Sequence, residues 1–432
     1  MTLSGSNNQS ILLRIAHSSK HIRNQQFLQL FNIIFDIEFR NLFKKGRFMK
    51  SKKHYMSIPI TLLFLIPLLL LSLTSCEKPR VKVKEKPIIR IGALLPLTGP
   101  LSKRGQQEKE AMELAIDDFN SNNGEIIIKV IFEDSYGRSS EDIAKKFLET
   151  DKVSAILAST TPVSRSIYSL ANKKKIIMAF LCSDPTIQKE SPYIFRLYES
   201  KESEAEQISK YYKIADKKIV VLYMDQPEIT NQLTNYLMPE FRKNKIKIIF
   251  YEPLVPGEKN FKETIDRVKL SEVNSIVMLG FGDELRLILE ELARQKLIGK
   301  TIIIGGIGLL SLNDSATILP DGVIVAVPQY VTEKNEKARA FDEKFLKTYD
   351  HAPNIHAAFA YTAVQILSEG LEYGLKKGQG SAETVSFYVT NRTYQGIMGE
   401  VHVDDQGALA VPMEVGVIRK GKILPLKVDE IK

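Results

Sequence analysis

The feature that most constrains the fold is a regular alternation of short apolar runs with amphipathic stretches, which extends from residue 88 to residue 304. The short runs are rich in Ile, Val and Leu, which is typical of strands buried on both faces of a sheet. Strands that alternate with helices in this way predict right-handed βαβ units and parallel sheets. The expected strands are 88–95, 125–132, 155–157, 176–180, 218–222, 246–251, 275–279 and 301–304.

The units form two successive series, which are separated near residues 195–198. Two such series indicate an α/β protein with two similar lobes. The alternation stops after the second series, and the chain reads as short strands after Tyr394. Residues 404–407 read Asp-Asp-Gln-Gly, and we interpret them as a hairpin turn rather than as metal ligands beside His402. The expected helices are 107–120, 140–149, 163–171, 232–244, 260–268, 284–295, 338–349 and 357–374.

An apolar, leucine-rich run over residues 58–75 ends at Cys76, one of only 2 cysteines in the chain. A cationic segment that starts at Met49 precedes it, and this order is that of a secretory signal peptide. The residues Leu-Thr-Ser-Cys at 73–76 resemble the bacterial lipobox, in which the signal is cleaved before a cysteine that receives lipid. A transmembrane anchor with an incidental cysteine is the alternative.

The expected mature chain is therefore lipid-anchored at the membrane through Cys76 and faces the periplasm or the cell exterior. Residues 49–75 are interpreted as the lipoprotein signal peptide and residues 76–87 as a charged tether. Residues 1–48 precede the expected start, and we interpret them as an N-terminal extension that the mature protein lacks.

The net charge of +9 raises the possibility of nucleic-acid binding, so its distribution matters. Residues 1–48 carry a net +5 and residues 49–86 carry +6, which leaves −2 for residues 87–432. The body of the protein is not basic, and we expect no nucleic-acid partner. Its only cysteine is Cys182, so it can form neither an intrachain disulfide nor a cysteine-based metal site.

Patterns of catalytic residues are scarce. The only His-x-x-x-His pair among the 6 histidines is formed by His17 and His21, in the N-terminal extension, and neither a Gly-x-Ser-x-Gly elbow nor a phosphate loop is found. The glycine-rich turns at 280–282 and 305–308 follow expected strands but lack the remaining features of a dinucleotide fingerprint. We expect no enzyme, no cofactor and no metal site.

Small hydroxyl residues stand instead at the carboxyl ends of two expected strands. Ser159 and Thr160 follow strand 155–157, and Ser183 follows strand 176–180. Ligands of parallel sheets bind at this edge, where helix N-termini present free N–H groups. Each hydroxyl could also be a helix N-cap. Because two such loops follow neighbouring strands, a carboxylate-binding site and a pair of helix N-caps are equally supported.

At this point a family resemblance is visible. Residues 89–100 read IRIGALLPLTGP, and they are followed by Arg-Gly-Gln at 104–106 and AIDDFN at 115–120. This opening resembles that of branched-chain amino-acid-binding proteins, the substrate-binding components of ABC importers with the type I periplasmic binding fold. The resemblance covers residues 88–420. Its weaker later pieces are residue 134 and segments 151–156, 193–196, 256–261, 321–323 and 396–399.

The resemblance implies two Rossmann-like lobes with parallel sheets, joined by a three-crossing hinge. Lobe 1 would comprise residues 88–197 and 328–394, and lobe 2 residues 198–327 and 395–432. The crossings would lie near residues 197, 327 and 394. Such a protein captures a small ligand between its lobes and delivers it to ABC permease subunits in the membrane. The hydroxyls that hold the ligand carboxylate in the family map onto Ser159, Thr160 and Ser183.

Departures from the family pattern concern the ligand. The family's aromatic contact falls on Phe281, and the acid that pairs with the ligand ammonium falls on Ile307, which carries no charge. Burying an ammonium without a partner costs several kcal/mol. Arg104 lies in the first binding loop, where it could bind a carboxylate or be a solvated charge. We expect a carboxylate ligand with an apolar portion, a branched-chain amino acid or related organic acid.

The lost acid also keeps open a second class of protein, a lipoprotein of the same fold that binds a protein partner or acts as a sensor, for example an activator of cell-wall synthesis. A dehydrogenase-like enzyme is disfavoured because the glycine fingerprint and a catalytic histidine are missing.

The first testable prediction concerns Cys76. We expect membrane-extracted protein to have the intact mass of a chain that starts at Cys76 and carries lipid, because the signal-like run ends there. A mature form that retains residues 58–75 would contradict this, as would normal processing and membrane attachment of a Cys76→Ala variant.

Overall fold

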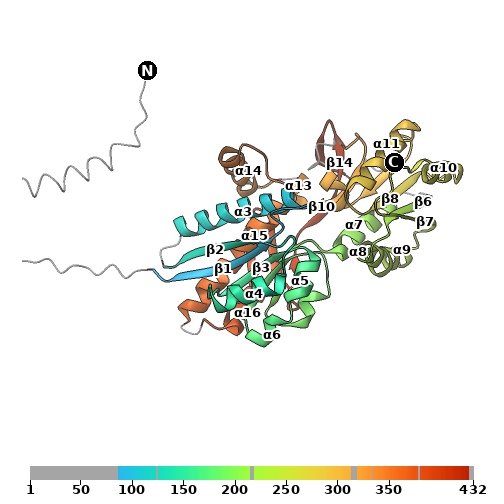
Figure 1. Ribbon diagram of the computed structural model, residues 1–432. Coiled ribbons are helices and arrows are strands. Elements are labelled where there is room, and N and C mark those ends of the chain that lie inside the picture. Colours follow the sequence, from blue (N-terminus) through green and yellow to red (C-terminus); the bar gives the residue numbers. More distant parts are fainter. Residues whose placement is uncertain are drawn as a thin grey trace, which may run out of the picture. The chain divides into compact units, whose positions relative to one another are not determined.

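The computed structural model describes residues 86–122, 125–214, 218–312, 319–332, 334–377 and 380–427. Its first sheet has five strands in the order β2-β1-β3-β4-β5, all of them parallel (Figure 1). The order places the first strand of the series inside the sheet, so that the chain winds outward in both directions. The bounds are β1 Ile88–Leu95, β2 Ile127–Asp134, β3 Ala155–Ser159, β4 Ile177–Leu181 and β5 Ile194–Arg196.

Helices cover both faces of this sheet. Along β4, Ile177 and Ala179 belong to the core formed with α3 and α15, whereas Met178 and Phe180 belong to the core formed with α4, α5 and α6. Both faces are therefore buried, which explains why the strands read as unbroken apolar runs. The bounds of these helices are α3 Ser102–Asn122, α4 Ser140–Glu149, α5 Thr161–Ile167, α6 Leu170–Lys174 and α15 Ile355–Lys376.

The second sheet has seven strands in the order β15-β14-β10-β9-β8-β6-β7. Strands β6 to β10 are parallel, and β14 and β15 extend the sheet in antiparallel pairing. The expected parallel sheet is thus the larger part of a mixed one. Its strands are β6 Ile219–Met224, β7 Ile248–Leu254, β8 Ser275–Leu279, β9 Ile302–Gly305, β10 Ile324–Pro328, β14 Met413–Arg419 and β15 Lys422–Pro425.

Helices flank the second sheet in the same manner. Residues of α7, α8 and α9 form one core with alternate strand positions, and residues of α10, α11 and α12 form the other. The bounds are α7 Lys201–Ile214, α8 Pro227–Gln232, α9 Met238–Lys243, α10 Lys262–Leu270, α11 Asp283–Arg294 and α12 Ile307–Leu310.

The third passage between the sheets lies later in the chain than the sequence predicted. Strands β11 to β13 form a separate antiparallel sheet, and Ala408 bridges to Arg196 in β5 of the first sheet. The chain joins the second sheet only at Met413, so the predicted passage near Tyr394 is wrong. The remaining elements are α13 Gln329–Thr332, α14 Glu336–Tyr349, α16 Ala382–Thr390, β11 Thr393–Gly396, β12 Gly399–Val403 and β13 Leu409–Ala410.

The turn at residues 404–407 is confirmed as a hairpin turn between β12 and β13. The Asp404 carboxylate accepts hydrogen bonds from the backbone N–H groups of Gln406 and Ala408, at 3.0 and 2.8 Å. The Asp404 carboxylate therefore stabilises the turn.

Two expected helices are interrupted for local reasons. The stretch 163–171 is split into α5 and α6 by a turn at Tyr168 and Ser169, and Lys175, which has a left-handed backbone, follows the end of α6. The stretch 232–244 contains a π-helical turn at Leu233–Leu237, just before α9. Pro239 lies at the start of α9 and has no N–H to donate to the preceding turn, so the regular hydrogen-bond pattern cannot continue there.

Predictions for the leader fall outside the described residues. Cys76, the signal peptide 49–75 and the extension 1–48 all lie there. Among the helices of the described ranges, none is both long and apolar enough to cross a membrane.

Helix α3 begins five residues before the expected start and contains Gly105. A Cβ at this position would lie 2.1 Å from the carbonyl oxygen of Pro96, well inside contact distance. Gly105 thus allows the first turn of α3 to approach the loop after β1 closely.

We predict that Gly105→Ala lowers the stability by about 1–3 kcal/mol, although alanine is normally the better helix former. Chemical denaturation measures the loss. The control is Gly396→Ala, whose new Cβ would meet only the side-chain oxygen of Gln365, at 3.4 Å. Equal stability of the two variants would contradict the prediction.

Candidate ligand-binding site

One backbone carbonyl joins three loops at the carboxyl edge of the first sheet. The carbonyl of Leu181, the last residue of β4, accepts a hydrogen bond from the backbone N–H of Thr160, at 3.1 Å. It also accepts one from Nη2 of Arg104, at 3.0 Å. The start of α3, the end of β3 and the end of β4 therefore meet here, as the sequence predicted for this edge. Ser183 follows two residues later and is half-buried.

Thr160 has an unusual backbone. Its φ is 75°, a region that β-branched residues rarely adopt. Such strain of order 1–3 kcal/mol persists only where neighbouring structure enforces it, and it concentrates at functional sites. Thr160 is the N-cap of α5, but its side chain makes no capping hydrogen bond. The hydroxyl of Thr160 therefore does not cap α5, which was the alternative considered from the sequence.

Arg104 is held by internal partners. Its Nε donates to Oε1 of Glu108 at 2.8 Å, and its guanidinium lies 5.2 Å from the ring centroid of Tyr198. With Leu181, these contacts engage two of its three nitrogens. Its side chain remains 20% exposed, so the group is accessible without being a freely solvated charge.

Oε1 of Glu108 also accepts a hydrogen bond from the hydroxyl of Ser159, at 3.0 Å. Both residues are fully buried. A serine hydroxyl can donate only one hydrogen bond, and that of Ser159 is donated to Glu108. This hydroxyl therefore cannot also donate to a ligand carboxylate. Burial raises the pKa of Glu108, and the opposing effect of Arg104 offsets only part of this. Glu108 thus balances the charge of Arg104.

A second group of charges follows the first crossing between the sheets. Nζ of Lys201 lies 3.3 Å from Oε1 of Glu199 and 3.4 Å from Oε2 of Glu204. Glu204 also accepts hydrogen bonds from Nε2 of Gln232, at 2.6 Å, and from the backbone N–H of Ile307, at 3.3 Å. A carboxylate therefore does lie against the backbone of residue 307, where the sequence placed no charge.

The two charged groups influence one another. Burial by itself lowers the pKa of Lys201, but Glu204 and Glu199 raise it above its ordinary value, so the ammonium stays charged. Burial raises the pKa of Glu199, which Lys201 and Arg104 both oppose. The pKa of His356 is held well below its ordinary value by burial and by the nearby charges of Arg104 and Lys201.

The neutral His356 shares a hydrogen bond of 2.6 Å with the hydroxyl of Tyr198, whose ring faces Arg104. The hydroxyls that have a basic partner here, Ser159 with Glu108 and Tyr198 with His356, are buried together with those partners. The arrangement holds charged and polar groups in fixed positions and offers a site for binding.

Sequence reasoning missed Glu108, Glu199, Lys201 and Glu204. The only signals were spacings, with Glu108 four residues after Arg104 and Glu204 three after Lys201, and such charge pairs are usually solvated helix faces.

The second half contributes Phe281, which follows β8. The residue is 40% exposed, and its backbone N–H donates to the sulfur of Met224, at 3.3 Å. The neighbours Gly280 and Gly282 both have positive φ, at 145° and 84°. The tight turn presents the ring at the carboxyl edge of the second sheet. None of the hydrogen bonds described here joins Phe281 to the Arg104 group.

The halves do contact each other at Glu228, in the first turn of α8. Its carboxylate accepts a hydrogen bond from the side chain of Thr161, and Asp184 and Arg165 lie near enough to affect its charge. Burial and the charge of Asp184 raise the pKa of Glu228. Asp184 itself forms an ion pair of 2.5 Å with Arg165.

Cys182 is buried between these loops. Its thiol has a pKa raised to about 11 by burial, so it is an inert packing residue rather than a nucleophile.

A cavity of about 660 Å³ adjoins the site on another face of α3. On one side it is lined by Lys103, Gln106 and Gln107 of α3. Arg104 and Glu108 lie on a neighbouring face of the same helix, because each follows a lining residue by one position. Leu310 and Ser311, at the end of α12, line its other side, so residues of both halves contribute.

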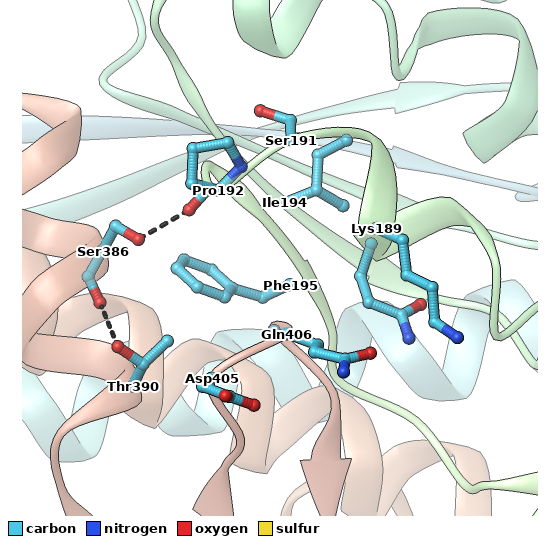
Figure 2. A pocket seen from close by; sticks show the side chains of 11 residues that line it. Lys189, Ser191, Pro192, Ile194, Phe195, Ser386, Thr390, Asp405 and Gln406 are labelled. Atoms are coloured by element: carbon cyan, nitrogen blue, oxygen red, sulfur yellow. Dashed lines mark hydrogen bonds between the residues drawn. The ribbon is translucent and has the colours of Figure 1, made fainter.

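Another cavity, of about 460 Å³, lies at the far side of β5 (Figure 2). It is lined by the 3₁₀ helix Ile187–Glu190, by the hairpin turn at 405–407 and by Ser386 of α16, which donates to the carbonyl of Pro192 at 2.6 Å. None of the sequence-predicted site residues lines it.

Comparisons with curated proteins find relatives over most of the chain. A leucine-, isoleucine-, valine-, threonine- and alanine-binding protein of Pseudomonas aeruginosa is 22% identical over 331 residues, which cover 74% of this chain and 87% of the relative. The Leu/Ile/Val-binding protein BraC3 of Rhizobium johnstonii is 26% identical over 317 residues, which cover 70% and 82%.

Solved structures share the fold. The branched-chain amino acid transporter substrate-binding protein LivJ of Streptococcus pneumoniae, in complex with isoleucine, matches with a TM-score of 0.66 and 21% identity, over 78% of this chain and 97% of its own. A solute-binding protein of an ABC transporter from Rhodopseudomonas palustris, in complex with 3,4-dihydroxybenzoic acid, matches with a TM-score of 0.69 and 17% identity, over 78% and 96%.

The family described as periplasmic binding protein matches residues 88–422, which include most of the chain and strands of both of its larger sheets. This agrees with the resemblance found in the sequence and with the two-sheet α/β fold. The expected protein class, a binding protein rather than an enzyme, is confirmed by this match. The chain belongs to the periplasmic binding protein family.

Proposed function

We propose that this protein is an extracytoplasmic, lipid-anchored solute-binding protein that captures a small carboxylate-bearing ligand between its two halves and delivers it to the permease subunits of an ABC importer. The observation that carries the proposal is the meeting of Arg104, Thr160 and the loop of Ser183 around the carbonyl of Leu181. Relatives that bind branched-chain amino acids, and structural neighbours that bind aromatic acids, support this ligand class.

Each group has a distinct role in the proposed complex. The third nitrogen of Arg104 and the hydroxyls of Thr160 and Ser183 donate to the carboxylate of the ligand. Hydrogen bonds to a charged group are worth roughly 1.5–3 kcal/mol each. The exposed ring of Phe281 packs against the apolar body of the ligand. Ser159 is not among the proposed ligand contacts, because its hydroxyl already donates its hydrogen bond to Glu108.

The contact between Glu228 and Thr161 supports closure of the halves around the ligand, since α8 of one half there touches α5 of the other. Closure of this kind needs hinge residues between the sheets, and the chain passes between them three times. The lipid on Cys76, proposed from the leader, would keep the protein beside its permease.

The proposal predicts that organic or amino acids with an apolar portion raise the midpoint of thermal unfolding, because a ligand that binds only the folded state stabilises it. Small-angle scattering of the purified protein with such a ligand should show a smaller radius of gyration. A screen in which no acid shifts the midpoint would argue for the alternative, a lipoprotein that binds a protein partner, and chemical turnover of a bound acid would contradict both.

A second prediction concerns the proposed carboxylate contact. Ser183→Ala should weaken the binding of such an acid severalfold or more in calorimetry, because a hydrogen bond to a charged group is lost. Ser154→Ala is the matched control, since Ser154 is exposed and precedes the opposite end of β3. Equal weakening by both substitutions, or by neither, would remove Ser183 from the site.

A further inference from the structure

The carboxylates around the site all have partners within the chain. Glu108 pairs with Arg104, Asp184 with Arg165, and Glu228 accepts from Thr161. Glu199 and Glu204 share the ammonium of Lys201. The side chains of Glu199 and Glu204 are almost fully buried, and that of Lys201 is 15% exposed. The chain itself thus supplies a cation to this buried pair of acids.

The position of Glu204 is fixed by its surroundings. Gly306 has no side chain, and a Cβ there would lie 1.9 Å from the carboxyl carbon of Glu204. The carboxylate therefore fits directly against the backbone at the end of β9, where it also accepts the N–H of Ile307. Gln232 of α8 holds its other oxygen, at 2.6 Å.

We infer that Lys201 acts as a resident counter-cation that fills the ammonium position of the ligand site, so that the protein selects carboxylic acids without an α-ammonium group over the corresponding α-amino acids. The inference rests on the proposed function and specifies the ligand class of that same site. An amino acid would have to displace Lys201 from two buried carboxylates or leave its own ammonium unpaired. A 2-oxo acid meets neither obstacle.

The inference makes Lys201 a specificity-determining residue whose removal changes preference as well as affinity. In Lys201→Met, the carboxylates of Glu199 and Glu204 lose their cation and become available to a ligand ammonium. The variant should therefore gain affinity for amino acids relative to oxo acids. A purely structural lysine would weaken both ligands alike.

The test is calorimetry with two matched pairs, leucine with 4-methyl-2-oxopentanoate and phenylalanine with phenylpyruvate. The wild-type protein is expected to bind the oxo acid of at least one pair tenfold or more tightly than its amino acid. In Lys201→Met the ratio should shift tenfold or more toward the amino acid. Lys201→Met/Glu199→Gln/Glu204→Gln should lose this shift, since both acids are then absent as well.

The matched control is Lys210→Met on the same helix. Lys210 is 57% exposed and pairs with Glu206 at 3.0 Å, so its loss should leave the ratio unchanged. If Lys201→Met unfolds on purification, the wild-type comparison of each pair still decides, because a preference for the amino acid overturns the inference.

The remaining outcomes separate this inference from the proposed function. If the protein binds these acids but Lys201→Met leaves the ratio of oxo-acid to amino-acid affinity unchanged, the role of Lys201 is overturned and the proposed function stands. Failure of the wild-type protein and the variant to bind any of the four acids, or any acid in the wider thermal screen, overturns both.

Discussion

The site depends on keeping an arginine charged at the carboxyl edge of the first sheet. A guanidinium withdrawn from water is tolerated only when its hydrogen-bond donors are satisfied and its charge is balanced. For Arg104 these requirements are met by the carboxylate of Glu108, the carbonyl of Leu181 and the ring of Tyr198. The partners come from α3, from the end of β4 and from the segment after β5. Satisfying one side chain therefore fixes three parts of the chain relative to one another.

This constraint explains features that look unrelated in the sequence. Gly105 allows the first turn of α3 to approach Pro96, and that turn carries Arg104 to the end of β4. The N–H of Thr160 reaches the same carbonyl of Leu181, and its backbone is held in a strained conformation there. Ser159 is turned inward to Glu108, whereas the hydroxyl of Thr160 does not cap α5. The sequence predicts that both hydroxyls hold the ligand carboxylate, and it does not show that Ser159 turns inward.

The fold could be predicted from the sequence wherever local pattern decides it. Helix α4 and strand β8 have the predicted bounds, because their apolar residues are periodic and their ends carry clear signals. The passage between the sheets after Ala410 could not be predicted, because β12 and β14 are both short strands that mix apolar and polar residues. Which sheet each joins is decided by distant partners, Arg196 for Ala408 and β10 for β14. The loops of the site were predictable because parallel strands end at one edge. The surroundings of their charge pairs were not, because they depend on contacts such as that between Ile307 and Glu204, which are 103 residues apart.

Ile307 shows why a missing residue type is weak evidence about a site. From the sequence, the charge expected at this position is lost, and the natural conclusion is that no acid is present. In the structure the backbone of Ile307 donates to Glu204, which lies 103 residues away along the chain, and Gly306 leaves the space that this carboxylate occupies. The same contact that restores the acid also brings Lys201 beside it. What distinguishes ligands at such a junction is the charge that remains after internal pairing, and here a negative charge is already matched by a lysine of the same helix.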